Sequence, residues 1–213
     1  MSIIEGIKQE KVVAVIRKAN QDNIVPILEA LADGGVHHVE ITAETPHVTQ
    51  LIEKAVKEVS TSIKVGAGTV LDAETARTVM MAGAAFVVSP TWNLDTLRLC
   101  QRYGVEHIPG VLTPTEISTA YEHGARMVKI FPADAVGPNY IKNIRGPLPH
   151  VTAMVTGGIT LDNMQDYLKA GSSAVGIGSN LVDALTLKTT ADYQELTNKA
   201  KAYRQQADLI DKQ

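Results

Sequence analysis

A joint that recurs along the chain constrains the fold more than any other feature of the sequence. At each joint a helix-like segment ends at glycine and an apolar, strand-like segment follows. Glycine suits this place because it accepts the left-handed backbone conformation found just past a helix C-terminus. The joints lie at Gly34-Gly35, Gly83, Gly104, Gly124 and Gly171.

The spacing of the joints predicts the number of strands. Gly83 and Gly104 are 21 residues apart, and Gly104 and Gly124 are 20 apart. The gaps from residue 35 to 83 and from 124 to 171 are 48 and 47 residues, so we expect one further joint near residues 60–62 and another near Gly146-Pro147. Seven joints and the strand before the first one give eight strands: Val12–Arg17, Val36–Thr42, Ile63–Gly68, Phe86–Ser89, Val105–Pro109, Met127–Phe131, Thr152–Thr156 and Ala174–Gly178.

Helical patterns separate these strands. They include Asn23–Ala32, Val48–Val59, Ala73–Met81, Leu94–Arg102, Pro114–Glu122 and Leu161–Lys169. Strict alternation of strands and helices is typical of a parallel sheet covered by helices. We therefore predict a single α/β domain over residues 1–213, a (β/α)8 TIM barrel with a short N-terminal helix and a final helix from Ala191. An open, doubly wound sheet is the alternative, because eight units alone do not require closure.

Composition and charge exclude several classes of function. The chain is 45% hydrophobic and 20% charged with a formal net charge of −3, so it carries no basic footprint for nucleic acid. Its one cysteine, Cys100, allows no disulfide within the chain, as is typical of a reducing compartment. Residues 1–10 lack a signal-peptide pattern, and no apolar run approaches the roughly 20 residues that span a bilayer. We expect a cytoplasmic protein with neither nucleic acid nor a membrane as partner.

One predicted strand carries a lysine inside an apolar run, Met127–Phe131, which is closed by Pro132. Alternate strand residues face opposite sides, so Lys129 shares a face with Met127 and Phe131. A buried lysine loses hydration, which disfavours its charged form, and a neutral amine is a nucleophile able to form a Schiff base with a ketone. The alternative is a surface strand whose lysine extends its ammonium into water.

Polar residues of the other strands are expected to meet this lysine inside the barrel. The outer face of each strand packs against helices, where an unpaired charge is costly, so the polar residues turn inward toward the C-terminal strand ends. An amine, a carboxylate and a guanidinium then converge at one mouth, which is the main functional signal. The residues expected around it are Arg17, Glu40, Thr42, Thr69, Lys129 and Thr156.

Glycine clusters follow the last two predicted strands, in Thr156-Gly157-Gly158-Ile159 and in Gly176–Asn180. Backbone amides after strands 7 and 8 are the usual phosphate-binding arrangement of this barrel, and glycine lets the backbone approach the phosphate oxygens closely. Each cluster alone is also explained by ordinary turn formation. Together, at these two strand ends, they favour a phosphate site.

Several motifs in a consistent order extend over nearly the whole chain. They are Val13–Arg17, Gly34-Gly35-Val36 with Val39–Thr42, Gly66–Val70, Val88-Ser89-Pro90, Ile108–Glu116, Lys129–Ala133 and Thr156–Ile159. In these motifs the chain resembles the 2-keto-3-deoxy-6-phosphogluconate / 4-hydroxy-2-oxoglutarate aldolase family. The resemblance implies a homotrimeric class I aldolase that cleaves a 4-hydroxy-2-keto acid to pyruvate and an aldehyde, without metal or other cofactor.

The resemblance also implies a role for each residue of the site. Lys129 would form the Schiff base and Glu40 would be the general acid and base. The pyruvate carboxylate and keto group would bind Arg17, Thr69 and Thr156, in a pocket shaped by Pro90 and Phe131. A distal phosphate would bind Gly157, Gly158, Gly178 and Ser179. Whether the substrate is phosphorylated stays open, because both kinds share the pyruvoyl half.

Glu44 departs from the pattern, because some relatives carry a carboxylate-binding arginine two residues after the strand-2 threonine. A carboxylate cannot bind another carboxylate, so Arg17 and Thr69 would have to bind the substrate, or the substrate preference differs. We expect Glu44 to be a solvated loop residue.

Two other classes of function stay open. One is a metal-dependent aldolase or another phosphate-binding barrel enzyme such as an epimerase, although only His37, His38 and His107 of the six histidines fall within the predicted strands and no ligand spacing stands out. The other is a sugar-phosphate binding module, which would not need Lys129 and Glu40. Trp92 and Tyr140 lie near strand ends, where we expect them to pack in loops.

Overall fold

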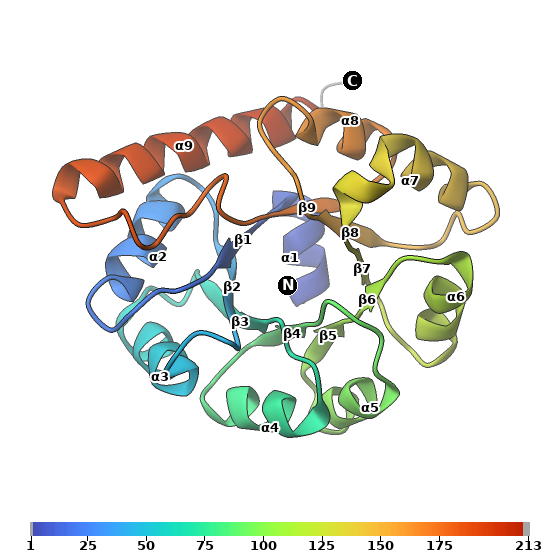
Figure 1. The fold of residues 1–213 in the computed structure, drawn as a ribbon, viewed down its shortest axis with the longest axis horizontal. Helices are drawn as coiled ribbons and strands as arrows, with labels where there is room; N and C mark the ends of the chain where they lie inside the picture. Colours follow the sequence, from blue (N-terminus) through green and yellow to red (C-terminus); the bar gives the residue numbers. More distant parts are fainter. Residues whose placement is uncertain (1, 211–213) are drawn as a thin grey trace.

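The alternating apolar segments of the sequence fold into a ring of parallel strands surrounded by helices (Figure 1). The computed structural model describes residues 2–210. The strands are β1 (Val12–Ile16), β2 (His38–Thr42), β3 (Lys64–Gly68), β4 (Phe86–Val88), β5 (Glu106–Ile108), β6 (Gly110–Val111), β7 (Val128–Ile130), β8 (Ala153–Thr156) and β9 (Ala174–Ile177). The predicted TIM barrel is confirmed.

Helices alternate with the strands around the outside. They are α2 (Ile24–Asp33), α3 (Val48–Glu58), α4 (Ala73–Met81), α5 (Leu94–Arg102), α6 (Pro114–Glu122), the 3₁₀ turn η1 (Ala133–Ala135), α7 (Gly137–Arg145), α8 (Met164–Lys169) and α9 (Thr190–Asp208). A further helix, α1 (Ile3–Glu10), precedes β1. Both terminal helices were expected, although residues 211–213 of the predicted last helix lie outside the described residues. None of the helices in residues 2–210 combines the length and apolar character needed to span a bilayer.

The ring of strands is completed at a segment that was predicted to be one continuous strand. The strand order is β5-β4-β3-β2-β1-β9-β8-β7-β6, and every pairing is parallel. The predicted strand Val105–Pro109 is two short strands, with β5 paired to β4 and β6 paired to β7. Pro109 separates them because it has no N–H for a ladder bond, while its carbonyl accepts from the Lys129 amide at 2.8 Å.

The glycine joints behave as the sequence predicts at the clearly marked positions. Gly35, Gly83, Gly104, Gly124 and Gly171 all have positive φ, between 68° and 105°. The two joints expected from spacing alone fall at the ends of α3 and α7 but use other conformations. Val59 after α3 is extended, and Gly146 after α7 has φ −55°.

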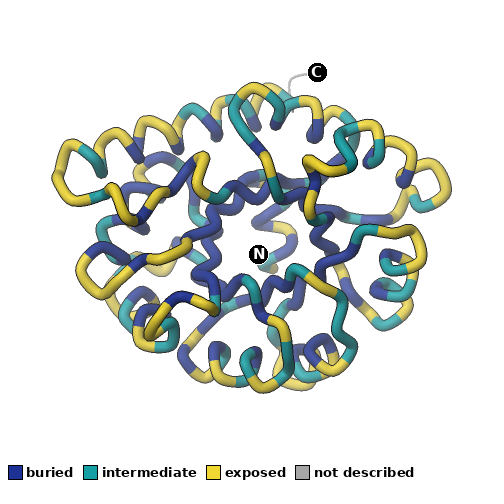
Figure 2. Tube along the Cα trace, in the orientation of Figure 1, coloured by how far each residue is buried: buried dark blue, intermediate teal, exposed yellow. Residues whose placement is uncertain are grey.

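Each strand buries both of its faces, as the dark ring in Figure 2 shows. Residues such as Val39, Ile41 and Val128 pack outward into the layer shared with the helices. The inner face forms a second apolar cluster at the N-terminal end of the barrel, into which α1 inserts Ile4 and Ile7. In Figure 1, α1 lies inside the ring of strands. The residues that meet it there are Val13, Phe86, Val88, Ile108, Met127, Met154 and Ala174.

A buried carboxylate anchors α1 to the barrel. Glu10 accepts from the backbone amides of His37 and His38 at 2.8 and 3.1 Å, and both imidazoles contact the same carboxylate. Burial raises the pKa of Glu10, but the hydrogen bonds and charge of His38, with those of His37, outweigh burial and leave it lowered. Arg204 of α9 donates to the Glu10 carbonyl. The N-terminal end of the barrel is therefore closed by α1, which the contacts of Glu10 hold in place.

We expect Ile7→Ala to lower the free energy of unfolding by about 2–5 kcal/mol, because it opens a cavity in the inner cluster where Ile7 is fully buried. Urea denaturation measures the change. The matched control is Gln9→Ala, at an exposed position of the same helix, which should change stability by less than about 0.5 kcal/mol. Equal effects of the two substitutions would contradict this account of the closed end.

Candidate active site

Lys129 and Glu40 meet across the interior of the barrel. Lys129 lies on β7 and Glu40 on β2, and β1, β9 and β8 separate these strands along the sheet. The Lys129 Nζ lies 3.7 Å from Glu40 Oε1, and the two side chains are 3% and 0% exposed. The surface-strand alternative for Lys129 is therefore wrong, since its amine lies inside the barrel beside a carboxylate.

The surroundings of the amine are mostly apolar. Lys129 pairs in register with Gly110 on one side and Met154 on the other, and the inner cluster containing Met127 and Met154 lies toward the closed end. The Nζ lies 5.3 Å from the centre of the half-buried Phe131 ring. The Phe131-Pro132 peptide bond is cis. These contacts shield the amine from water on the side away from the mouth.

Burial dominates the electrostatics of Glu40. Desolvation raises the pKa of its carboxyl group, and the positive charges of Lys129 and Arg17 oppose that rise only in part. Glu40 Oε1, Glu40 Oε2 and Thr156 Oγ1 are buried atoms without a hydrogen-bond partner among the described residues. Buried polar atoms are nearly always hydrogen-bonded, so two unpartnered carboxylate oxygens of Glu40 beside the Lys129 amine are a mark of a functional site.

Glycines on adjacent strands make room for the functional side chains. A Cβ at Gly68 would lie 2.7 Å from Glu40 Oε1, and one at Gly176 would lie 2.5 Å from Thr156 Oγ1. A Cβ at Gly178 would lie 2.9 Å from Arg17 Nη1. Each polar side chain thus lies over a position where any larger residue would displace it.

A glycine also lets Pro90 lie close to the neighbouring strand. A Cβ at Gly110 would come within 2.2 Å of the Pro90 backbone carbon, so Pro90 packs directly on the strand that pairs with Lys129. Pro90 is half-buried, like Phe131.

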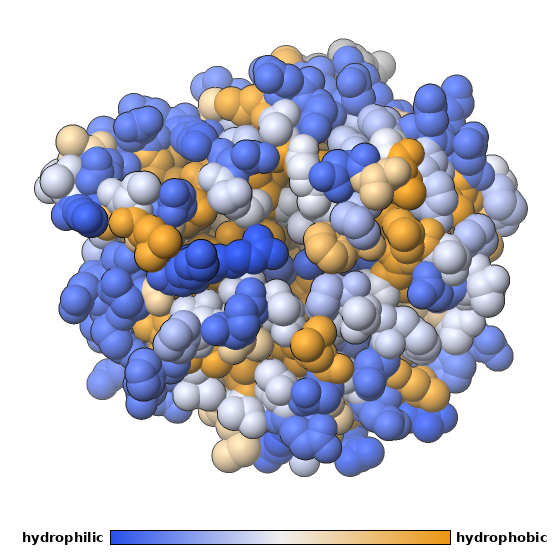
Figure 3. Space-filling model, viewed as in Figure 1, coloured by the Kyte–Doolittle hydropathy of each residue, from blue (hydrophilic) through white to orange (hydrophobic). Residues whose placement is uncertain are grey.

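Two non-glycine residues at the mouth have left-handed backbone conformations. Lys18, directly after Arg17, has φ 57°, and Thr69, at the end of β3, has φ 55°. Such conformations cost free energy for residues with a Cβ and cluster at functional sites. Figure 3 shows a strongly hydrophilic band that runs from the rim to the centre of this face. The predicted residues Arg17 and Thr69 directly follow β1 and β3, so they lie at the C-terminal strand ends that form the mouth.

Glu44 is an exposed residue of the turn after β2, as the sequence predicts, but it also faces Arg17. Its Oε1 lies 3.8 Å from Arg17 Nε, with both side chains about half exposed. The Thr45 amide donates to the Thr42 carbonyl at 3.0 Å, so Glu44 occupies a closed turn at the end of β2. The Thr45 hydroxyl accepts from the Lys18 amide at 3.4 Å and joins this turn to the end of β1.

The predicted phosphate site has free backbone donors. Within residues 2–210, the amides of Gly157, Gly158 and Ser179 donate to no other protein group. Gly157 and Gly158 have φ 106° and 68°, which turns the chain sharply at the end of β8. Ser179 is exposed and begins a single turn, closed by the Leu181 and Val182 amides donating to Gly178.

Two asparagines that the sequence analysis did not single out hold these glycine loops. Asn163 donates to the Gly158 carbonyl at 2.9 Å, and Asn180 donates to the Ile159 carbonyl at 2.8 Å. Asparagine within a few residues of a glycine turn is the signal that points to such contacts. The first bond closes the loop after β8 on itself, and the second joins it to the loop after β9.

Other polar groups fall outside this constellation. Ser89 bonds His107 Nε2 at 2.8 Å, both residues are buried, and burial lowers the pKa of His107 to about 4. Tyr140 lies on α7 and not in a loop, and it donates to the carbonyl of Leu112, directly after β6. Across residues 2–210, no three His, Cys, Asp or Glu side chains gather in the way that a metal ion needs.

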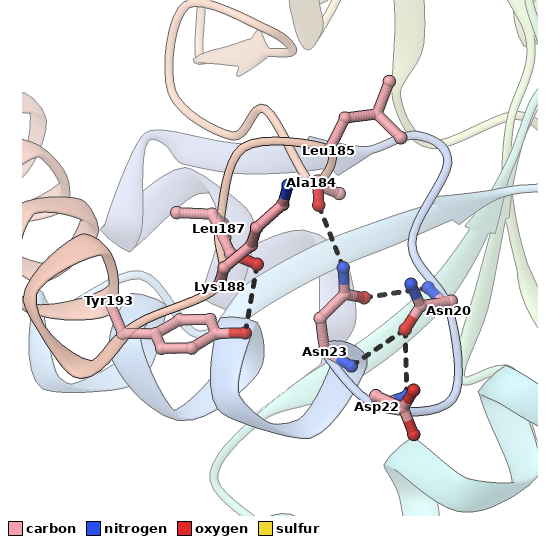
Figure 4. Close-up of a pocket in the computed structure, with 8 residues that line it drawn as sticks. All are labelled: Asn20, Asp22, Asn23, Ala184, Leu185, Leu187, Lys188 and Tyr193. Atoms are coloured by element: carbon pink, nitrogen blue, oxygen red, sulfur yellow. Dashed lines mark hydrogen bonds between the residues drawn. The ribbon is translucent and has the colours of Figure 1, made fainter.

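A cavity of about 330 Å³ lies beside the mouth (Figure 4). Its asparagines are paired within the protein: Asn23 donates to the Ala184 carbonyl at 2.9 Å, and Asn23 Oδ1 accepts from the Asn20 amide at 2.8 Å. Neither Lys129 nor Glu40 lines this cavity. The buried pair of Lys129 and Glu40, with its unpartnered carboxylate oxygens, marks the stronger candidate site.

Comparison with known proteins agrees with this site. The family model described as KDPG and KHG aldolase matches residues 3–199. The chain is 38% identical over 162 residues to the 2-dehydro-3-deoxy-phosphogluconate aldolase of Pseudomonas aeruginosa, covering 76% of this chain and 73% of that one. It is 34% identical over 195 residues to the 2-dehydro-3-deoxy-6-phosphogalactonate aldolase of Escherichia coli K12, covering 91% and 94%.

A solved structure supports the same family assignment. The KDPG aldolase of Legionella pneumophila, with pyruvate captured at low pH as a covalent carbinolamine intermediate, superposes with a TM-score of 0.87 at 30% identity. The superposition covers 94% of this chain and 98% of that one. The protein therefore belongs to the KDPG and KHG aldolase family, whose named members are aldehyde-lyases.

Proposed function

We propose that the protein is a class I aldolase that cleaves a 4-hydroxy-2-keto acid to pyruvate and an aldehyde through a Schiff base on Lys129. The observation that carries the proposal is the buried Lys129 amine 3.7 Å from the buried carboxylate of Glu40. An amine in this setting is a nucleophile toward a ketone, and the carboxylate is near enough to exchange protons with it directly or through one water. The pyruvate carbinolamine of the Legionella relative supports the same chemistry.

The reaction follows from these two groups. Once Glu40 has accepted a proton from Lys129, the amine adds to the C2 ketone, and loss of water from the carbinolamine gives an iminium ion. Removal of the proton from the C4 hydroxyl breaks the C3–C4 bond, and its electron pair passes to the iminium to form an enamine while the aldehyde leaves. Protonation of the enamine at C3 and hydrolysis then release pyruvate and the free amine. Glu40 carries the protons of these steps.

The remaining site residues bind the ends of the substrate. Arg17, Thr69 and Thr156 take the carboxylate and keto oxygens, and Pro90 and Phe131 shape the apolar wall. The amides of Gly157, Gly158 and Ser179, with Gly178 beside them, bind a distal phosphate, because they are free donors after the last two strands. A phosphorylated six-carbon keto acid is the preferred substrate, with 4-hydroxy-2-oxoglutarate as a slower one.

The oligomeric state and the cellular compartment of the enzyme belong to the same proposal. The protein acts as a homotrimer, as its family resemblance implies, and a designed cage that fuses symmetric oligomeric domains includes a chain similar to it, with a TM-score of 0.86. It acts in the cytoplasm on small keto acids. The single buried cysteine suits that reducing compartment, because burial raises the pKa of the Cys100 thiol to about 11 and leaves it unreactive.

Borohydride reduction in the presence of pyruvate should trap one covalent adduct per chain on Lys129, since the iminium is the reducible species. Peptide mass spectrometry locates the adduct. The Lys129→Ala variant should form none, whereas Lys142→Ala, which removes a lysine from the outer helix α7, should label like the parent protein. An adduct that persists without Lys129 would rule out the proposed nucleophile.

We expect Glu40→Gln to lower kcat by about 10²- to 10⁴-fold, the usual size of a general acid–base contribution. The pKa of Glu40 is raised, so protonation removes the base at a higher pH than for an ordinary carboxyl, whose pKa is 4.5. Activity of the parent protein should therefore fall as pH decreases through that raised value, and this acid limb should be absent from the variant's pH–rate profile.

The Glu40→Gln protein should remain folded. A raised carboxyl pKa means that ionised Glu40 destabilises the native state as pH rises, so the neutral amide should maintain or increase stability at neutral pH. Thermal unfolding checks this. A large drop in melting temperature would show that the loss of activity is structural, and an unchanged acid limb would remove Glu40 from the mechanism.

A negative charge at the phosphate site should separate the two kinds of substrate. Ser179→Asp should raise KM for the phosphorylated keto acid about tenfold or more by repulsion, and should change KM for 4-hydroxy-2-oxoglutarate much less. Ser62→Asp, an exposed position before β3, is the matched control for added charge. Equal effects of Ser179→Asp on both substrates would place the phosphate elsewhere.

A further inference from the structure

The rim of the mouth contains an ion pair that the proposed mechanism does not use. Arg17 Nε faces Glu44 Oε1 at 3.8 Å, and Glu44 is the carboxylate partner found for Arg17 within residues 2–210. The other edge of the guanidinium points elsewhere, since its Nη1 lies over Gly178 at the end of β9. One edge of Arg17 thus faces an internal anion, and the other edge has two N–H-bearing nitrogens with no protein anion.

The position of Glu44 is held by the fold. It lies in the turn closed by the Thr45 amide and the Thr42 carbonyl, and Thr42 and Thr45 are both buried. Their hydroxyls lie 3.2 Å apart, and the Thr45 hydroxyl also accepts from the Lys18 amide next to Arg17. These contacts tie the end of β2 to the end of β1. These contacts hold the backbone at Glu44 close to the end of β1, which keeps its carboxylate within reach of the Arg17 guanidinium.

We propose that Glu44 acts through Arg17 to lower the affinity of the site for the keto-acid carboxylate. The inference rests on the proposed function, in which that carboxylate binds Arg17. A ligand carboxylate on the free edge of the guanidinium shares one cation with Glu44 and is repelled by it. The consequence is a site that holds pyruvate weakly and releases it readily.

The size of the effect follows from electrostatics. Two carboxylates on opposite edges of a guanidinium are about 7 Å apart, and at an effective dielectric constant between about 40 and 80 their repulsion changes affinity by about three- to eightfold. Because both Arg17 and Glu44 are half exposed, salt screens this repulsion. The effect is on ground-state binding, so it moves KM and leaves kcat unchanged.

The test is exchange of the pyruvate methyl protons in deuterium oxide, followed by proton NMR, because this reaction needs only the pyruvoyl half of the substrate. Glu44→Gln should lower the KM for pyruvate about three- to eightfold at low salt, with kcat within about twofold of the parent value. The advantage should shrink toward unity at about 0.5 M salt, where charges more than a few ångströms apart are screened.

Three controls separate charge from structure. Glu44→Asp keeps the charge and should keep a KM close to that of the parent protein. Glu122→Gln removes an exposed carboxylate from the C-terminal end of α6, at the opposite end of the barrel, and should change nothing. In an Arg17→Met background, Glu44→Gln should change KM by less than about twofold, since the shared cation is gone.

An unchanged or higher KM in Glu44→Gln would overturn the inference, as would a decrease that persists at high salt or that appears equally in Glu122→Gln. The proposed function fails separately. If pyruvate gives no borohydride adduct on Lys129 in the parent protein, the aldolase mechanism is wrong, whereas an adduct with an unmoved KM rejects only the role of Glu44.

Discussion

The structure depends on holding an amine and a carboxylate together away from water. Transfer of either charge into an apolar interior is costly, and their mutual attraction repays that cost only when the geometry is constrained. Lys129 and Glu40 come from opposite strands of a closed ring, so neither can move outward without crossing the sheet. The helix α1 and the inner apolar cluster exclude water from the far side. Closure of the barrel is thus a requirement of the chemistry.

Space inside the ring is limited, and glycine supplies it. Gly68, Gly176 and Gly178 lie beside Glu40, Thr156 and Arg17 in turn, each at a distance that leaves no room for a Cβ. A lumen filled by branched side chains, as in the floor of this barrel, would be more stable but would have no room for polar groups. In the C-terminal half of the interior, glycines take the place of branched side chains so that polar groups fit. This arrangement lowers stability in favour of activity, a usual conflict in enzymes.

Much of this arrangement follows from the sequence. Period-2 alternation put Lys129 and Met127 on one strand face, and the glycine joints gave the number of α/β units, because both effects are local. The break at Pro109 was missed since it arises from a strand changing neighbours, which is a property of the closed ring. The contacts of Glu44 and Asn180 were missed for a related reason: each joins two loops whose proximity exists only once the strand ends have converged. The bond of Asn163 to Gly158 is local, within the loop after β8, and depends on the turn conformation of that loop.

The charges at the rim also affect the buried pair. The Arg17 guanidinium lowers the pKa of Glu40, and Glu44, whose effect is the smallest of those acting on this carboxyl, raises it. In the proposed function Arg17 binds the substrate carboxylate, and Glu44, which faces the same guanidinium, opposes that binding directly. Its effect on the Glu40 carboxyl is the weakest of those that act there, so we expect Glu44 to change ligand binding and to leave proton transfer by Glu40 almost unaltered.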